Sequence, residues 1–232
     1  MTAGTVLLWR HGRTAFNAQA RLQGQVDIEL DEVGRWQASE AAAELARRVR
    51  PDRIVASDLV RAAGTARALA QVTGLEVHLD PRLRERNFGA WEGLTGPEIA
   101  ERWPEQYAAW RSGNDPERTG AESRAQVAER MASAVIAHSA DLSEDQTLAV
   151  VSHGAAITLG ITTLLGLDPH GWRGVVGLHN AHWAVLHAST GHSVPAWRLG
   201  GHNIGPSVHV SDWNAGRRSE SLPSSTEDAL RS

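Results

Sequence analysis

Cysteine is absent from the 232-residue sequence, which excludes disulfides, thiolate metal sites and cysteine nucleophiles. Lysine is absent too, so all 23 basic residues are arginine. A biased genome is the simplest cause of the missing lysine. Whatever the cause, any anion site in this chain must use guanidinium groups, which bind phosphate oxygens in two-point geometry.

Long apolar runs are also missing, and none approaches the roughly 20 residues needed to span a membrane. The N-terminus has no basic region followed by a long apolar stretch and a cleavage site, so we expect no secretory signal. A net charge of -4 lacks the basic excess typical of a general nucleic-acid binder. These features predict a globular protein in the cytoplasm that binds neither membrane nor nucleic acid.

Short apolar runs alternate with helical patterns along the chain. Three segments share one design, in which an apolar run meets an abrupt polar or glycine break and then, in two of them, a clear helix. The runs cover residues 6–9, 53–56 and 148–151, the helices residues 59–72 and 156–165, and a further helix residues 32–48. Residues 76–79 suit a fourth strand, and residues 183–187 and 196–199 suit edge strands. This alternation predicts an α/β fold with a mostly parallel sheet and crossover helices.

Two regions depart from this alternation. Residues 94–130 are polar, helical and interrupted by glycine and proline, and we interpret them as an insertion packed beside the sheet. Residues 215–232 are rich in Ser, Arg and Glu and cannot bury enough surface to offset their ordering entropy. We therefore expect a single domain over residues 1–214 and a flexible tail over residues 215–232.

Basic and nucleophilic side chains lie just after the three strand–break junctions. In open parallel sheets, ligands bind outside the carboxyl ends of the strands. The junctions bring Arg10 with His11, then Arg61, then His153 to that edge. Their convergence predicts an anion site.

His11 is the candidate nucleophile of this site. A histidine nucleophile must be neutral at the attacking nitrogen, with its other nitrogen held as a donor. Gly12 after it allows a backbone turn and a close approach of substrate. The alternative is a histidine that only caps the end of a strand.

Arg10 and Arg61 are predicted to bind the non-bridging phosphate oxygens, which carry the charge in phosphoryl transfer. His153 precedes a helix whose N-terminus would also face the anion. Two alternatives stay open: a solvated helix face for Arg61, and a buried structural role for His153.

Glu85 is the candidate proton donor for the leaving oxygen, and the base that then activates water. It lies among arginines, so a surface ion pair is the alternative interpretation. Asp58 is the competing carboxylate, but we expect it to cap the following helix.

An ordered set of motifs resembles the histidine phosphatase superfamily, which has the phosphoglycerate mutase-like fold. The set spans most of residues 5–214 and comprises Arg10-His11-Gly12, Thr14, Asn17, Arg21-Leu22-Gln23-Gly24, Ser57-Asp58-Leu59, Arg61-Ala62, Thr65-Ala66, Leu83-Arg84-Glu85, Gly89, Trp91, Glu92-Gly93, Leu94-Thr95, Gly120, Glu122-Ser123 and His153-Gly154.

The resemblance implies an α/β/α sandwich and a metal-independent phosphomonoesterase without cofactor. It implies that His11 is phosphorylated and that Glu85 is the proton donor. It also implies that the phosphate or the substrate is bound by Arg10, Asn17, Gln23, Gly24, Arg61, His153 and Gly154. The partner is then a small phosphate ester, and a homodimer stays open.

Two positions depart from the family pattern. Arg13 stands where Glu or Gln is usual, and we expect it to be solvated rather than to charge the pocket mouth. Ala155 replaces a frequent second glycine, which we expect to change only packing.

The residues after Glu85 indicate the branch of the family. The long insertion typical of cofactor-dependent mutases is missing, and residues 88–95 are similar to phosphatase branches. The whole pattern is most similar to members that dephosphorylate glucosyl-3-phosphoglycerate, so this ester or another sugar or glycerate phosphate is the expected substrate.

Three rival functions remain at this point. A phosphoglycerate mutase would share the core residues. A non-catalytic phospholigand-binding module would be expected to lose His11 or Glu85. A metal hydrolase could use the C-terminal histidines, but their spacing is irregular and lacks carboxylate motifs; they are His179, His182, His187, His192 and His202.

Overall fold

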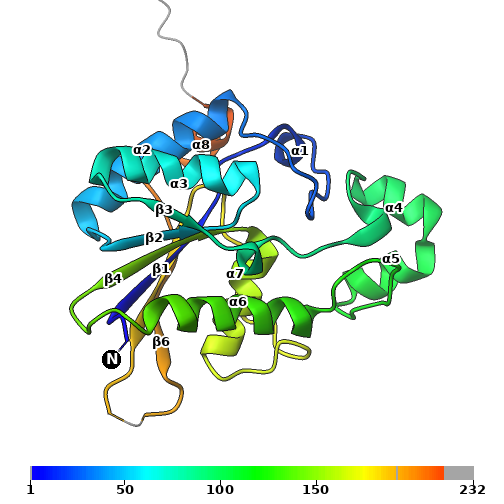
Figure 1. Cartoon of the computed structure of the whole chain (residues 1–232). Helices are drawn as coiled ribbons and strands as arrows, with labels where there is room; N and C mark the ends of the chain where they lie inside the picture. Colours follow the sequence, from blue (N-terminus) through cyan, green and yellow to red (C-terminus); the bar gives the residue numbers. More distant parts are fainter. Residues whose placement is uncertain (1, 192, 217–232) are drawn as a thin grey trace, which may run out of the picture.

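The structure is a computed structural model that describes residues 2–191 and 193–216. One six-stranded sheet runs through it in the order β3-β2-β4-β1-β5-β6 (Figure 1). The strands are β1 (Thr5–Arg10), β2 (Arg53–Ala56), β3 (Val77–Leu79), β4 (Thr147–Ser152), β5 (Trp183–Ala188) and β6 (Trp197–Ile204). The first four are parallel, whereas β5 is antiparallel to β1 and to β6. The predicted mostly parallel sheet is confirmed.

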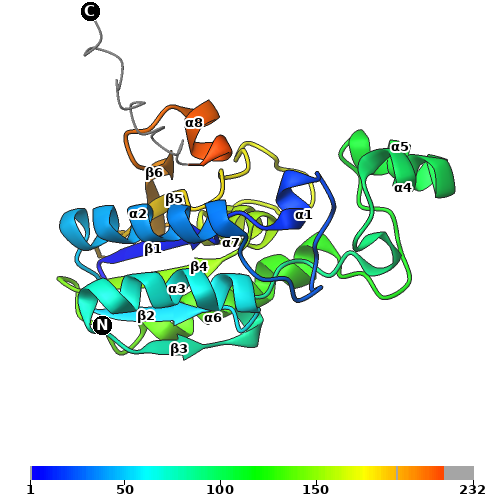
Figure 2. The same cartoon turned by 90° about the horizontal axis from the view of Figure 1, so that it is seen from above.

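Helices cover both faces of this sheet, with α6 and α7 on one face and α2, α3 and α8 on the other (Figures 1 and 2). The α/β/α sandwich is therefore confirmed. The helices are α1 (Ala15–Ala18), α2 (Glu32–Arg48), α3 (Val60–Thr73), α4 (Gly96–Arg102), α5 (Pro104–Arg111), α6 (Arg124–Ser139), α7 (Gly154–Leu164) and α8 (Val210–Ala215), with 3₁₀ turns at Pro81–Leu83 and Gly89–Trp91.

Strand β1 shows how the sequence builds two cores from one strand. Successive side chains of a strand point to opposite faces. Val6 and Leu8 pack against α6 and α7, whereas Leu7 and Trp9 pack against α2, α3 and Trp213 of α8. Each of the four β1 side chains is fully buried, and burial of such a side chain is worth roughly 1.5–3 kcal/mol. These contacts fix the strand end that carries His11.

The predicted insertion over residues 94–130 extends too far along the chain, because its last residues belong to a core helix. Helices α4 and α5 do stand apart from the sheet, as Figure 2 shows. Residues 124–130, however, belong to α6, whose Val127 and Met131 are buried in the core. Polar residues in the first turns of α6 conceal this core helix in the sequence.

The prediction of an edge strand at residues 183–187 is wrong as well. Strand β5 lies between β1 and β6, with Trp183 and Leu186 buried. Only β6 has the predicted edge position on this side of the sheet.

The boundary of the expected tail also moves. Helix α8 ends at Ala215 and buries Trp213, so the ordered chain continues past residue 214. The rest of the expected tail, residues 217–232, lies outside the described residues. Within residues 2–191 and 193–216, no helix has the length and apolarity needed to cross a bilayer.

Candidate active site

The carboxyl ends of β1 and β4 and the first turn of α3 bring three predicted residues into contact. The rings of His11 and His153 have centroids 5.1 Å apart. Arg61 reaches from α3 and places its Nε 3.2 Å from Nδ1 of His153. All three side chains are buried, with at most 2% of their surface exposed.

His11 has its ring fixed by the adjacent backbone. Its Nδ1 lies 2.7 Å from the carbonyl oxygen of Gly12, so Nδ1 carries the proton and donates it. Burial lowers the pKa of His11 well below its ordinary value, and the charges of Arg61 and Arg10 lower it further. The ring is therefore neutral, and its Nε2 has a free lone pair.

His153 has the opposite tautomer. Because Arg61 Nε can only donate, Nδ1 of His153 accepts and the proton resides on Nε2. That Nε2 is buried and has no hydrogen-bond partner among the described residues. Burial, followed by the charges of Arg61, His11 and Arg10, lowers the pKa of His153 well below its ordinary value. An N–H donor without a partner among the described residues thus lies on the ring that contacts His11.

Arg10 supplies a second unpaired donor. Its Nη1 donates to the carbonyl oxygen of Leu178 at 2.5 Å, but its Nε is buried without a partner among the described residues. Gly154 lies next to this group, since a Cβ at that position would be in ordinary van der Waals contact with Arg10 Nε, at 3.5 Å. Burial lowers the pKa of Arg10, while the nearby Glu85 works in the opposite direction.

Arg61 is more constrained than a free phosphate clamp. Its Nη1 donates to the carbonyl of Val26 at 2.8 Å and its Nη2 to that of Gly24 at 2.7 Å. One N–H on each of these nitrogens remains for an anion. Burial lowers the pKa of Arg61 to about 10, so the group stays cationic at neutral pH. The predicted solvated alternative for Arg61 is wrong.

Helix α1 and the loop between α1 and α2 add side-chain amides. Asn17 accepts from Thr14 and from Asn180 through its Oδ1, and Gln23 accepts from Thr14 Oγ1 through its Oε1. Their side-chain nitrogens therefore stay available as donors. Gly24 has a φ of +53°, and a Cβ there would collide with Glu92, so only glycine suits this position.

Glu85 faces the start of α7. Its Oε1 accepts from the amides of Arg86 at 2.8 Å and Ala156 at 3.0 Å, and its Oε2 accepts from Ala155 at 3.1 Å. Two amides in the first turn of α7, those of Ala155 and Ala156, therefore bind Glu85, and the predicted contact of this helix N-terminus with the anion is left to Gly154. The surface ion-pair interpretation of Glu85 is also wrong.

Asp58 does not cap α3 as predicted. Leu59 occupies the N-cap without a side-chain hydrogen bond. The carboxylate of Asp58 instead binds Arg84 through two hydrogen bonds of 2.7 and 2.5 Å. Attraction between these opposite charges across two loops outweighs the local capping preference.

Arg13 is paired and only partly solvated, with 23% of its side-chain surface exposed. Its Nε donates to Asp31 at 2.8 Å and its Nη1 to the carbonyl of Asn214 at 2.6 Å. It lines a cavity of about 480 Å³ at the site, together with Arg10, Asn17, Ala18, His179, Asn180 and Asn214. Arg13 thus contributes charge to the rim of this cavity while joining the catalytic loop to the end of α8.

Gly12 has a different role from the predicted one. Its φ is not positive, and a Cβ there would lie 2.3 Å from the carbonyl oxygen of Gly34 in α2. Glycine is needed because two backbones touch, and the amide of Gly12 then donates to Thr65 at 3.1 Å.

Asn180 was missed by the sequence reasoning. Its Nδ2 donates to the carbonyl of His11 at 3.2 Å and to Asn17 Oδ1 at 3.1 Å. Because β5 is antiparallel to β1, the start of β5 lies beside the end of β1, where Trp183 pairs with Trp9. Recognising β5 as a neighbour of β1 would have placed Asn180 at the site.

The C-terminal histidines do not form a metal-like cluster. Across residues 2–191 and 193–216, no group of three or more His, Cys, Asp or Glu has an arrangement suited to a metal ion. The rings of His179 and His182 contact each other, His187 contacts Thr5, and His202 contacts the Val176 carbonyl. His192 lies outside the described residues.

Known proteins share this architecture. The chain is 39% identical over 213 residues to glucosyl-3-phosphoglycerate phosphatase of Mycobacterium tuberculosis, covering 86% of this chain and 94% of the relative. It is 39% identical over 168 residues to a probable phosphoglycerate mutase of Escherichia fergusonii, covering 70% and 75%. A solved mycobacterial glucosyl-3-phosphoglycerate phosphatase in complex with VO3 superposes with a TM-score of 0.78, at 40% identity, covering 87% and 99%.

A sequence model of a whole family matches the same region. It is the model of the histidine phosphatase superfamily (branch 1), and it matches residues 6–198. That span contains the two histidines in contact, their arginines and Glu85. The chain therefore belongs to the histidine phosphatase superfamily.

Proposed function

We propose that this histidine phosphatase hydrolyses the phosphate monoester of glucosyl-3-phosphoglycerate, or of another sugar or glycerate phosphate, through a phosphohistidine at His11. One observation carries the chemistry: the neutral His11 ring contacts the His153 ring, and His153 Nε2–H and Arg10 Nε are buried without a partner among the described residues. A neutral nucleophile surrounded by guanidinium and imidazole donors suits a phosphate dianion.

In the first step, the lone pair of His11 Nε2 attacks phosphorus and the bond to the leaving oxygen breaks. The donors of Arg10, Arg61 and His153 would stabilise the charge on the non-bridging oxygens. Glu85 gives its proton to the leaving alkoxide. We assign that proton to Oε2, which accepts only one amide, whereas Oε1 accepts two.

In the second step, water attacks the phosphohistidine. Glu85, now a carboxylate, accepts a proton from that water. The bond between phosphorus and His11 Nε2 then breaks and inorganic phosphate leaves. Asn17, Gln23 and Gly24 are proposed to hold the phosphate through both steps, since both side-chain nitrogens are available and Gly24 positions Arg61.

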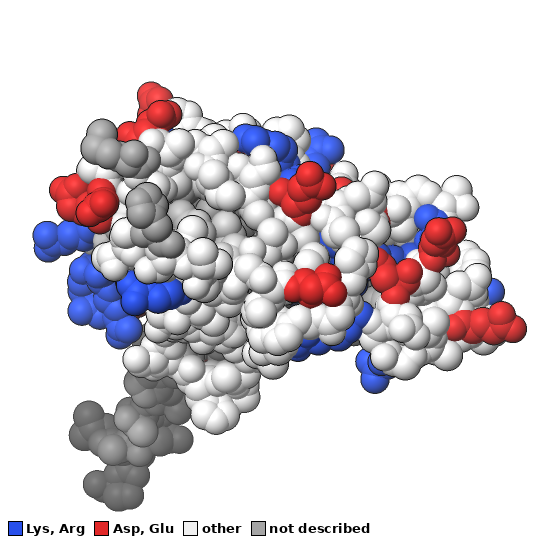
Figure 3. Space-filling model, turned by 90° about the horizontal axis from the view of Figure 1, so that it is seen from below, with Lys and Arg blue, Asp and Glu red and all other residues white. Residues whose placement is uncertain are grey.

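The substrate proposal rests on the relatives. The mycobacterial relative named for glucosyl-3-phosphoglycerate covers more of this chain than the probable mutase, 86% against 70%. The missing insertion after Glu85 favours water over a second sugar or glycerate as phosphoryl acceptor. A small ester also suits the surface, since on the face shown in Figure 3 basic and acidic side chains form separate small groups and no continuous basic stripe. A cytoplasmic location is part of the same proposal.

A turnover screen over phosphorylated sugars and glycerates tests this proposal. We expect the highest kcat/KM with glucosyl-3-phosphoglycerate and one free phosphate per ester consumed, without a bisphosphate primer and without loss after chelation. Conversion of 3- to 2-phosphoglycerate with little free phosphate would identify a mutase instead. Size-exclusion chromatography of the same preparation tests the homodimer.

A further inference from the structure

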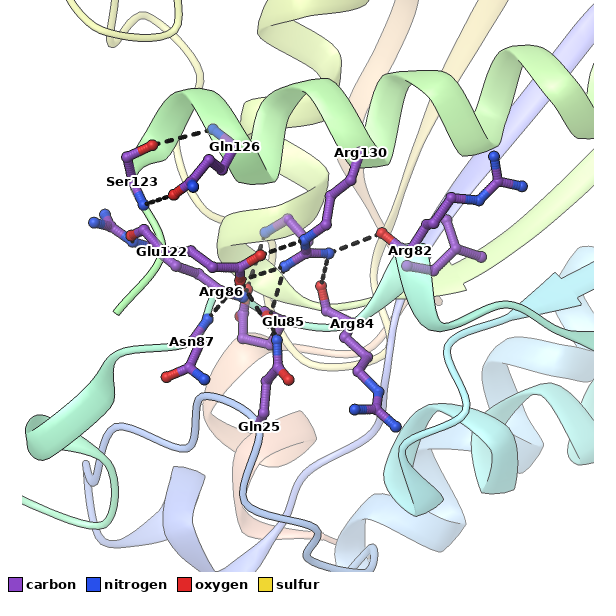
Figure 4. Close-up of polar contacts among 12 residues, drawn as sticks. Gln25, Arg82, Arg84, Glu85, Arg86, Asn87, Glu122, Ser123, Gln126 and Arg130 are labelled. Atoms are coloured by element: carbon purple, nitrogen blue, oxygen red, sulfur yellow. Dashed lines mark hydrogen bonds and ion pairs between the residues drawn. The ribbon is translucent and has the colours of Figure 1, made fainter. Parts of the chain in front are cut away.

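Arg130 of α6 uses three of its five guanidinium N–H groups on the chain around Glu85 and the other two on Glu122 (Figure 4). Its Nη1 donates to the carbonyls of Arg82 at 2.8 Å and Arg84 at 2.6 Å, and its Nη2 donates to that of Glu85 at 2.9 Å. The two remaining groups, on Nε and Nη2, bind the carboxylate of Glu122 at 2.7 and 2.8 Å. A guanidinium has no further donor.

Glu122 extends this contact to the other side of Glu85. Its Oε2 accepts from the amide of Asn87 at 2.9 Å. Burial works to raise the pKa of Glu122, yet hydrogen bonds from Arg130 and Asn87 hold it below its ordinary value. The Arg130–Glu122 pair therefore holds the chain both before and after Glu85.

Gln25 connects the Arg130–Glu122 pair to the loop of residues 23–26, which contacts Arg61. Its Nε2 donates to the carbonyl of Glu85 at 3.1 Å and to Glu122 Oε2 at 3.4 Å. Its backbone follows Gly24, whose carbonyl binds Arg61. The position of Glu85 is thus tied to the loop that contacts the phosphate-binding arginine.

The segment depends on such ties because it has no regular secondary structure of its own. Between the 3₁₀ turns Pro81–Leu83 and Gly89–Trp91, residues 84–88 form no helix or named strand. Two of its carbonyls, the carbonyl of Arg82 just before it and the half-buried carboxylate of Glu122 converge on one guanidinium. Only a planar fork with five donors can bind all of them. A misplacement of about 1 Å in a catalytic group can cost roughly 10²-fold in rate.

We propose that the Arg130–Glu122 pair is a positioning device for the leaving-group acid, acting on the reaction only through Glu85. This inference rests on the proposed function, in which Glu85 protonates the leaving oxygen. It assigns Arg130 and Glu122 no contact with substrate. Their removal should therefore affect esters in proportion to how much the leaving group needs a proton.

Two esters separate this role from general support of the fold. A nitrophenolate leaves largely unaided, whereas the alkoxide of 3-phosphoglycerate needs the acid. We would measure kcat/KM for both esters in the parent, Arg130→Lys, Arg130→Met, Glu85→Gln and the double variant Glu85→Gln/Arg130→Met. Arg130→Lys keeps a positive charge next to Glu122 and serves if Arg130→Met fails to fold.

The expected result is a split between the esters. Arg130→Met, and more weakly Arg130→Lys, should lower kcat/KM for 3-phosphoglycerate at least 10-fold more than for nitrophenyl phosphate. In the Glu85→Gln background the same change at Arg130 should produce no further split. Arg124→Met is the matched control, because Arg124 begins the same helix and its Nε binds the Pro169 carbonyl instead.

Two results would overturn the inference, and they are distinguishable. Equal losses for both esters in the Arg130 variants, while Glu85→Gln still splits them, would make the pair purely structural and leave the proposed function intact. Equal losses for both esters in Glu85→Gln itself would remove the acid role of Glu85 and, with it, the positioning role.

Discussion

Nε of Arg61 lies 3.2 Å from Nδ1 of His153, and this single contact sets the proton of His153 on its other nitrogen. The guanidinium cannot accept, so the imidazole must. Arg61 thus binds the carbonyls of Gly24 and Val26 and also determines which ring nitrogen of His153 can donate to an anion.

Arg61→Lys is expected to lower kcat/KM by about 10²-fold or more, by analogy with the loss of one preorganised donor. Lysine keeps the charge, but it cannot hold Gly24, Val26 and His153 together. The measurement is steady-state kinetics alongside ¹⁵N spectra of the His153 tautomer. Arg67→Lys on the exposed side of the same helix is the control. Rates near those of the parent would show that Arg61 does not contact the phosphate.

His11→Ala is expected to abolish turnover and the covalent intermediate while leaving the fold intact, since the neutral His11 ring supplies the attacking lone pair. Acid quench with labelled substrate should trap an acid-labile phosphoenzyme in the parent. The exposed His78→Ala variant should trap it equally well. Equal trapping in His11→Ala would place the nucleophile elsewhere.

The stability of the protein should fall as the pH drops below about 6.5, the ordinary pKa of histidine. His11 and His153 have pKa values well below this in the folded state, so only the unfolded chain binds their protons in that range. Each contributes a slope of at most about 1.4 kcal/mol per pH unit. Denaturant unfolding at pH 7.5 and 5.5 measures the total loss in the free energy of unfolding between these two pH values. In His153→Gln the drop should be smaller, and an unchanged drop would contradict the assignment.

Gly34→Ala is expected to destabilise the protein by about 1–3 kcal/mol, the usual cost of overpacking. A Cβ on Gly34 would lie 1.9 Å from the carbonyl oxygen of Arg13, so either α2 or the loop after His11 must move. The midpoint temperature of thermal unfolding and kcat should both be lower in Gly34→Ala than in the parent. Gly177→Ala, where nothing lies within 4 Å of the added Cβ, should change neither. Wild-type stability in Gly34→Ala would show that this contact is loose.

Much of the layout could be predicted from the sequence because its signals are local. An apolar run ending in Arg10-His11-Gly12 or in Ser152-His153-Gly154 marks the end of a buried strand, and parallel strands bring such ends to one edge. Helix α2 begins and ends at the predicted residues because Asp31 caps it and the apolar pattern is regular.

Contacts between distant segments could not be predicted in this way. Asp58 prefers Arg84, which lies 26 positions away, to the helix beside it. Arg130 resembles a surface arginine of a polar stretch, and its three carbonyl partners carry no side-chain signature. Asn180 reaches His11 only because β5 inserts beside β1, a pairing that no local pattern encodes.

The same pairing has a consequence for how the protein is made. Strand β1 is the first to be synthesised, yet its two neighbours, β4 and β5, begin at Thr147 and Trp183. More than half of the chain must leave the ribosome before β1 gains its first hydrogen-bonded neighbour. Until then the apolar stretch before His11 stays unprotected, where a chaperone can bind it. No N-terminal fragment ending before β4 can hold a formed nucleophile site.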